Sequence, residues 1–269
     1  MIGHFFAHAP LVLAGLVLFI AMILARELGA YASNVAARRH EAKPDANGDA
    51  NVLLSMALGL LSLLIGFAFS LSLSRFDHRR ELVVSEASTL STAAQRIQLL
   101  EGPTKDALTS RLRDYASTRA LAGAAEVDEQ RHQLERKAEG LSVSLIQATI
   151  AAVTPIRGTS TASFVLDGVD HAVDLADQRE AAAEAKLPNR VIEALCIYCV
   201  VVAGLFGYAL ATTSTRNRVA GYLLFALFAF AIATILDLDR PLGGSIMVGQ
   251  EPMMSVLQKL TVPPLGHAQ

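Results

Sequence analysis

The sequence has no tryptophan, only two cysteines and few charged residues. Charged side chains make up 18% of the 269 residues and hydrophobic ones 52%, a balance too apolar for an ordinary soluble protein of this length. The net charge of −2 gives no reason to expect nucleic acid as a partner. Both cysteines, Cys196 and Cys199, lie in one hydrophobic segment, which argues against a disulfide framework. The composition predicts an integral membrane protein.

Motifs that would indicate an enzyme are also missing. The sequence contains no nucleophile elbow, phosphate-binding loop or zinc-protease motif. The two cysteines have no second pair of metal ligands within reach, so neither zinc binding nor redox chemistry is expected. Asp167, Asp170, Asp174 and Asp177 have the spacing of a solvated helix face rather than of a calcium-binding loop. We therefore predict no catalytic residues, no cofactor and no metal.

Four apolar segments are long enough to cross a membrane, which takes about 20 helical residues. They cover about residues 9–31, 52–74, 191–212 and 219–236. The first is interrupted by Arg26-Glu27, so this span is expected to tilt or to end early. A cleavable signal peptide is the alternative there, although no Lys or Arg precedes the apolar run.

The fold class predicted from this pattern is an all-α membrane protein. Four transmembrane helices form two pairs, and a helical soluble domain is inserted between the second and the third. The predicted boundaries are 1–74 for the first pair, 75–188 for the helical extramembrane domain, 189–237 for the second pair and 238–269 for a C-terminal tail.

The second span continues beyond the bilayer without a helix breaker. No Pro or Gly follows Ser74 until Gly102-Pro103, so one helix is expected over about 52–101. Its outer part has an apolar seam with steps of four and three residues, made of Val83, Ala87, Leu90, Ala94 and Ile97. Further helices are predicted from Thr104, over 128–153, and from a Thr159 cap to Lys186.

Small residues form a stripe along the second span. Its members are Ser55, Gly59, Ser62, Gly66, Ser70 and Ser74, spaced so that they share one helix face. Tight helix packing in the membrane is one interpretation. The other is a pore wall whose hydroxyl groups replace an ion's hydration shell.

Charged residues follow this span directly. Arg75, Asp77, His78, Arg79, Arg80 and Glu86 could form a solvated helix exit at the headgroups or an electrostatic collar that selects ions. A second cluster, Asp237, Asp239 and Arg240, ends the fourth span. Acids at a helix C-terminus oppose the macrodipole, so this cluster predicts either a structural lock or a site for a cation or partner.

The orientation in the membrane follows from the short loops. Arg26, Arg38, Arg39 and Lys43 are counted for the loop between the first two spans, and Arg216 and Arg218 for the loop between the last two. The positive-inside rule places both loops in the cytoplasm. The helical domain is then extracytoplasmic, although the cations flanking that domain favour the opposite side.

Two adjacent blocks, Gly59–Ser70 and Ser74–Ala87, resemble the bacterial bestrophin-like membrane family, a domain of unknown function. The similarity extends over nearly the whole chain. It includes Arg26-Glu27-Leu28-Gly29, Tyr115 with Arg119, Arg179 ahead of Leu187-Pro188, and Asp237-Leu-Asp-Arg-Pro-Leu-Gly243. Where that family tends to have Glu-Ala-Asn, this chain has Glu86-Ala-Ser.

This resemblance implies a multi-pass protein of the bacterial inner membrane. It also implies kinship with bestrophin anion channels, which are pentamers with four spans and a helical domain between the second and third. Bestrophins keep that domain in the cytoplasm, against the loop charges of this chain.

Two functional hypotheses follow. One is a homo-oligomeric channel for a small inorganic ion, lined by the second span. The other is a non-conducting scaffold or sensor in the lipid bilayer that binds a protein partner through its helical domain.

Overall fold

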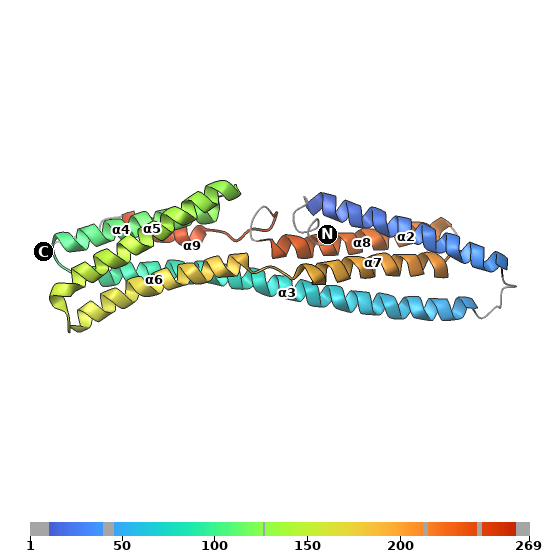
Figure 1. The fold of residues 1–269 in the computed structure, drawn as a ribbon, viewed down its shortest axis with the longest axis horizontal. Coiled ribbons are helices and arrows are strands. Elements are labelled where there is room, and N and C mark those ends of the chain that lie inside the picture. The colour runs from blue at the N-terminus through green and yellow to red at the C-terminus, as the bar shows by residue number, and fades with distance from the viewer. Residues whose placement is uncertain (1–10, 40–45, 126, 212–214, 241–243, 262–269) are drawn as a thin grey trace. The chain divides into compact units, whose positions relative to one another are not determined.

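The computed structural model describes residues 11–39, 46–125, 127–211, 215–240 and 244–261. Throughout these ranges the regular structure is helical, and no strand is present in them. The helices are α2 (Leu11–Arg39), α3 (Ala46–Ile97), α4 (Pro103–Ala124), α5 (Asp128–Val153), η1 (Thr154–Ile156), α6 (Ser160–Glu184), α7 (Asn189–Ala209), α8 (Thr215–Asp239) and α9 (Glu251–Thr261) (Figure 1).

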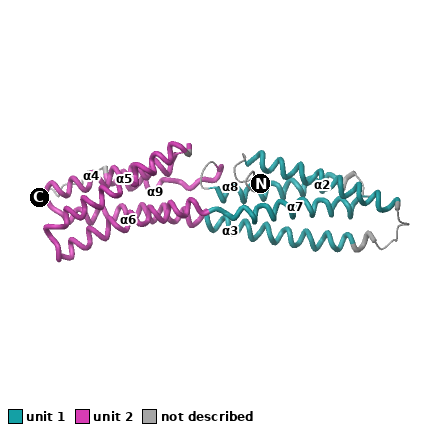
Figure 2. The backbone as a smooth tube through the Cα atoms, in the orientation of Figure 1, with its two compact units in different colours: residues 1–75, 186–240 teal, residues 76–185, 241–269 magenta. Residues whose placement is uncertain are grey.

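The chain divides into two compact units. Unit 1 contains Met1–Arg75 and Lys186–Arg240, and unit 2 contains Phe76–Ala185 and Pro241–Gln269 (Figure 2). Residues 241–269 therefore group with Phe76–Ala185, which begins within α3 and ends after α6. Residues 241–243, the last three of the block from Asp237 to Gly243 that resembles the bestrophin-like family, lie outside the described residues.

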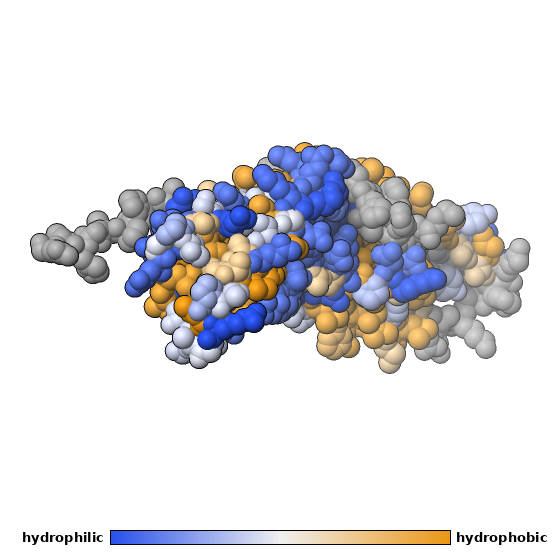
Figure 3. Space-filling view, turned by 60° about the vertical axis from the view of Figure 1, so that its left-hand side comes forward, coloured by the Kyte–Doolittle hydropathy of each residue, from blue (hydrophilic) through white to orange (hydrophobic). Residues whose placement is uncertain are grey.

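Unit 1 has an apolar interior formed by four helical segments. α2 packs against α7 and α8, with Leu18 and Met22 buried, and α3 adds Leu54 and Leu61. Many large apolar side chains of the unit are nevertheless exposed, as expected for helices surrounded by lipid. In the view of Figure 3, apolar residues form broad areas of the molecular surface.

The tilt or early end of the first span at Arg26-Glu27 stays a prediction, but the helix itself does not end there. α2 continues through these residues to Arg39. Arg26 pairs with Glu27, and both side chains bond to the hydroxyl of Tyr222 on α8. The charges are thereby neutralised and hydrogen-bonded, so the helix has no need to end where they occur.

Five helical segments are long and apolar enough to cross a membrane by length and composition. They are Leu11–Arg38, Ala50–Ile97, Glu129–Ile156, Ser160–Ala209 and Arg218–Asp239. One of these, Glu129–Ile156, belongs to unit 2. The number of four spans therefore stays a prediction.

Unit 2 is a bundle whose core is made by α3, α4, α5, α6 and α9. Of the predicted seam, Val83, Ala87, Leu90 and Ile97 are buried and Ala94 is half-buried. The α5 boundaries agree with the predicted 128–153, and the predicted cap of α6 is confirmed because the Thr159 hydroxyl accepts from the Ala162 N–H.

Two predicted helix ends are wrong by a few residues. α3 ends at Ile97, and the next three N–H groups make tighter turn bonds to carbonyls three residues back. α4 starts at Pro103 rather than being capped by Thr104, because Gly102 occupies the capping position with φ of 68°. Proline suits the first helical position since its missing N–H has no partner there in any case.

Candidate functional site

The small-residue stripe of α3 faces away from the rest of unit 1. All six of its members, Ser55, Gly59, Ser62, Gly66, Ser70 and Ser74, are exposed in the single chain. The buried residues of the same segment are Leu54, Leu61 and Ala68. At about 100° per residue, the stripe lies roughly 150° around the helix from this buried line. Among the residues that the structure describes, the stripe therefore has no packing partner.

The two glycines of the stripe border open space. A Cβ atom added to Gly59 or Gly66 would meet no atom within 4 Å. The hydroxyls of Ser55 and Ser62 donate to the carbonyls four residues earlier, each at 2.9 Å. Their donors are thus satisfied within the helix, and the hydroxyl oxygens still have lone pairs to offer.

Glycines elsewhere in unit 1 do pack tightly. A Cβ at Gly207 on α7 would overlap the carbonyl of Arg26, and one at Gly29 on α2 would overlap the carbonyl of Gly204. Small residues let the backbones of α2 and α7 touch, as expected for helix pairs in lipid. The intrachain packing role of small residues therefore belongs to these glycines and not to the stripe.

The six residues predicted as a charged collar do not share one environment. Asp77, His78 and Arg80 are exposed and Arg75 is half-buried. Arg79 and Glu86 are buried in unit 2, with exposed fractions of 5% and 0%. The structure thus separates an outer group of charges from two that belong to the interior of the bundle.

Glu86 is the centre of a buried ion network. Arg119 of α4 donates from Nε to Oε1 of Glu86 at 2.8 Å, and Arg179 of α6 donates from Nη1 to Oε2 at 2.6 Å. Arg179 also donates from Nη2 to the side-chain oxygen of Gln250 at 2.8 Å. Arg119 donates from Nη2 to the carbonyl of Ala176 at 3.2 Å. One carboxylate therefore ties α3 to α4 and α6, and Arg179 extends the network to the segment before α9.

The two arginines determine the charge state of Glu86. Burial alone would raise the pKa of Glu86, but Arg119 and Arg179 outweigh this and hold it below the ordinary 4.5. Burial would likewise lower the pKa of Arg119, and the Glu86 carboxylate keeps it above its usual range. Burial raises the pKa of the neighbouring Tyr115. At neutral pH the network holds one carboxylate and two guanidinium ions.

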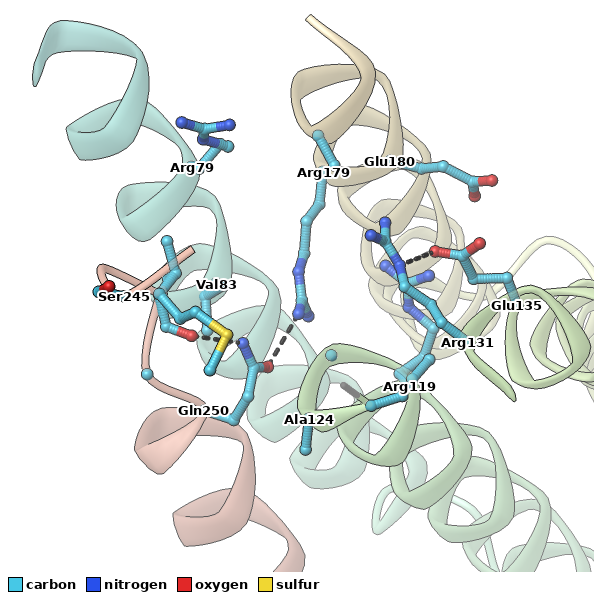
Figure 4. A pocket seen from close by; sticks show the side chains of 17 residues that line it. Arg79, Val83, Arg119, Ala124, Arg131, Glu135, Arg179, Glu180, Ser245 and Gln250 are labelled. Atoms are coloured by element: carbon cyan, nitrogen blue, oxygen red, sulfur yellow. Dashed lines mark hydrogen bonds and ion pairs between the residues drawn. The ribbon is translucent and has the colours of Figure 1, made fainter. Parts of the chain in front are cut away.

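A cavity of about 500 Å³ lies beside this network in unit 2. Its charged lining comes from α3, α4, α5 and α6, namely Arg79, Arg119, Arg131, Glu135, Arg179 and Glu180. Arg131 pairs with Glu135 at 2.6 Å, and Arg179 reaches from α6 toward Gln250 (Figure 4). The segment Ser245–Gln250 forms a further wall. The sequence motifs did not predict this cavity.

The acidic cluster at the end of α8 contains a structural lock. Both carboxylate oxygens of Asp239 accept from the backbone N–H of Leu187 at 2.9 Å. This bond fixes the end of α8 to the residues that lead into α7. Within the ranges that the structure describes, no group of three or more His, Cys, Asp or Glu side chains is arranged to hold a metal. For Asp239, these contacts favour the predicted lock over a cation site.

The ion pair between Glu86 and Arg119 was not predicted, although the position of each residue on an apolar helix seam indicated that its side chain would be buried. Arg119 continues the seam of Leu108, Leu112 and Tyr115, all of which are buried. An arginine on a core seam requires a buried carboxylate, since Lys, Arg, Asp and Glu are almost never fully buried unless paired. Glu86 lies between the buried seam residues of α3, so it was the acid that could have been predicted to pair with Arg119.

Comparison with known proteins identifies close structural relatives. Residues 14–253 match the family described as Bestrophin-like domain. A solved bacterial bestrophin homologue from Klebsiella pneumoniae has 14% identity and a TM-score of 0.67, over 93% of this chain and 97% of that one. A point mutant of the same homologue has 16% identity and a TM-score of 0.66, over 91% and 96%. No curated protein matches this chain significantly.

Proposed function

This chain belongs to the family of Bestrophin-like membrane proteins, and from this premise we propose that it forms a homo-oligomeric ion channel in the bacterial inner membrane, with α3 lining the pore. The observation that carries the proposal is the orientation of the small-residue stripe. Its six members are exposed although the opposite face of the same helix is buried.

An exposed stripe of glycine and serine is better placed facing the central axis of an oligomer than facing lipid. Lipid-facing positions of this helix carry bulky apolar residues such as Leu60 and Phe67, which are 46% and 60% exposed. Glycine and serine instead allow helices from neighbouring copies to approach closely and leave a narrow polar path between them. A ring of copies around this stripe combines both interpretations, packing and pore lining.

Conductance of the purified protein in planar bilayers tests the proposal. We expect wild-type protein to conduct and Gly66→Leu to reduce conductance several-fold, because the new side chain starts from a Cβ position that borders open space and extends into the path. Leu60→Phe is the matched control. It adds bulk to an exposed position roughly 120° away on the same helix, and it should leave conductance unchanged.

The oligomeric state should be measured on the same samples by native mass spectrometry. A monomer that does not conduct would refute the channel. Unchanged conductance in Gly66→Leu would remove α3 as its lining. Reversal potentials in asymmetric potassium chloride would then identify the permeant ion, for which the kinship with bestrophins predicts an anion.

An oligomer without conductance would favour the scaffold hypothesis. Unit 2 supports that hypothesis through large apolar side chains that remain exposed in the single chain. They include Leu99, Leu121, Val127, Val143, Ile150, Phe164 and Leu166. A protein partner captured from membranes by the full chain, and lost when Leu121 and Val127 are changed to Ser, would establish that function instead.

The side of the membrane on which unit 2 lies needs a direct measurement. The loop charges predict an extracytoplasmic unit 2, and kinship with bestrophins predicts a cytoplasmic one. Reporter fusions at Gln269 distinguish them, since residues 241–269 group with unit 2. Alkaline phosphatase activity there would support the loop charges, and green fluorescence would support the bestrophin topology.

A further inference from the structure

A second, smaller cavity lies within unit 2. It has a volume of about 270 Å³, and its lining residues come from α4, α5 and α6. Beyond conduction, we propose that this smaller cavity binds a small primary amine in its ammonium form. The volume is just below the roughly 300–1,000 Å³ of sites for drug-sized ligands, so it suits a molecule of a few heavy atoms.

Tyr115 of α4 forms the buried part of the smaller cavity. The residue is only 1% exposed, and among the residues that the structure describes its hydroxyl makes no hydrogen bond. The hydroxyl oxygen is nevertheless not fully enclosed by protein, so the open space beside it is the cavity. An unpaired hydroxyl in such a place costs free energy, and a ligand that bonds to it removes that cost.

Unpaired carboxylates lie around the same cavity. Glu139 on α5 and Asp177 and Glu180 on α6 are exposed lining residues, and none of the three has an ion pair within the described part of the chain. Glu135 also lines the cavity, but Arg131 neutralises it at 2.6 Å. Three carboxylate charges are thus available to a ligand.

The cations of the cavity wall do not cancel these three charges. Arg119 belongs to the buried network, in which Glu86 neutralises one of the two guanidinium ions of Arg119 and Arg179. That network contributes one positive charge, and the exposed Arg136 contributes another, with His132 counted as neutral. The excess is therefore one negative charge, which favours a monovalent cation.

The arrangement of the oxygen atoms favours an ammonium group over a metal ion. Within the ranges that the structure describes, no three His, Cys, Asp or Glu side chains are arranged to hold a metal. A primary ammonium has three N–H donors that point in different directions, so it can bond to oxygen atoms that do not converge on one point.

Tyr115 and Asp177 are the two residues that one ammonium group can bond together. Burial raises the pKa of Tyr115, and the nearby Asp177 carboxylate raises it further, so the hydroxyl stays neutral and its oxygen can accept a hydrogen bond. A bond from the ammonium to Asp177 is charge-assisted and is therefore the stronger of the two. The hydroxyl thus selects an ammonium that has N–H donors, and the carboxylates select its charge.

Titration calorimetry on the full chain in uncharged detergent tests the proposal with three probes. Butylammonium carries the charge and the N–H donors, tetramethylammonium carries the charge alone, and butanol has the alkyl chain of butylammonium without a charge. We expect saturable binding of butylammonium, binding of tetramethylammonium weaker by about tenfold, and none of butanol. Added salt should weaken the binding of butylammonium, because ions screen the exposed carboxylates.

Three variants locate the site. Tyr115→Phe removes only the hydroxyl group and should weaken butylammonium binding about threefold to tenfold, the value of one hydrogen bond. Asp177→Asn removes a lining carboxylate and should weaken binding by a similar factor. Asp174→Asn is the matched control, because Asp174 is exposed one turn earlier on α6 and does not line the cavity. It should bind as the wild type does.

Four results would overturn the proposal. They are no saturation by butylammonium, equal affinity for tetramethylammonium, unchanged binding in Tyr115→Phe, and equal weakening in both asparagine variants, which would indicate general attraction to the acidic face of α6. Size-exclusion profiles verify that each variant is folded, and the surface variant Asp177→Asn preserves the test if Tyr115→Phe is not. Binding is measured without conductance, so the result does not depend on whether the protein is a channel.

Discussion

The two parts of α3 meet their neighbours in different ways. In unit 1 the helix buries only a thin line, Leu54, Leu61, Ala68 and Ser72, and exposes the small-residue stripe together with leucines and phenylalanines. In unit 2 the same helix buries a broad face that includes the charged Glu86. In lipid, burying an apolar side chain inside the protein lowers the free energy little, because lipid tails are equally apolar. The residues that contact neighbouring helices are therefore determined by how well their shapes pack and not by their hydrophobicity. In the extramembrane setting that the sequence predicts for unit 2, the apolar seam alone identifies the buried face.

The largest expected effect comes from removing the acid of the buried network. Glu86→Gln leaves Arg119 and Arg179 as two buried cations without a counter-ion. We expect a loss of about 3–5 kcal/mol in the free energy of unfolding, measured by chemical denaturation in constant detergent. Glu81→Gln, exposed on the same helix, should change it by less than about 0.5 kcal/mol. Equal effects would show that unit 2 does not depend on this network.

The second-largest effect on stability is expected from the close backbone contact between α2 and α7 in unit 1. Gly207→Ala places a methyl group against the Arg26 carbonyl and should cost about 1–3 kcal/mol through separation of α2 and α7. Gly59→Ala provides the control because its methyl group meets open space in the single chain. In Gly59→Ala the free energy of unfolding of the monomer should rise by up to about 1 kcal/mol, because alanine has a better helix propensity than glycine. A destabilised monomer in Gly59→Ala would contradict the outward orientation of the stripe.

The lock at the end of α8 should contribute less. Asp239→Asn keeps an oxygen acceptor for the Leu187 N–H but removes the carboxylate charge. A charge-assisted bond is worth about 1 kcal/mol more than a neutral one, and the thermal midpoint should fall accordingly. Asp174→Asn changes an exposed aspartate and should leave the midpoint in place. An unchanged midpoint in Asp239→Asn would mean that other contacts fix this helix end.

The smallest effect concerns pH. The folded pKa of Glu86 is lower than its unfolded value, so its contribution to stability is complete above the ordinary 4.5 and is lost as the pH falls toward the folded value. The stability gap between wild type and Glu86→Gln should therefore be constant from about pH 5 to 7 and narrow below the ordinary pKa. A gap that already changes between pH 6 and 7 would place the folded pKa above its usual range and contradict the ion network.

Periodicity predicted most helices because it is a local property. The seam of α3, the boundaries of α5 and the Thr159 cap all depend on residues within a few turns of each other. The family resemblance is confirmed by the match over residues 14–253. The contact of Arg26 and Glu27 with Tyr222 was not predicted, because the hydroxyl that bonds to both side chains is far away in sequence.

Long-range pairing explains what was missed in unit 2. Glu86 was assigned to a headgroup collar because neighbouring residues are charged, yet its partners lie 33 and 93 positions further along the chain. α9 was described only as part of a tail, although Met253, Val256 and Leu260 have helical spacing and are buried. The cavity depends on four helices and a loop together, and no single segment predicts it.

The discontinuity of unit 2 has a consequence for biogenesis. Its core includes Met253, Val256 and Leu260, and Arg113 of α4 bonds to the carbonyl of Leu260. Those residues leave the ribosome after α7 and α8, so α3 to α6 wait with an open core while these two helices are synthesised. A ribosome stalled before Glu251 would hold a bundle that a protease can still cut, and completion of the last eleven helical residues closes it.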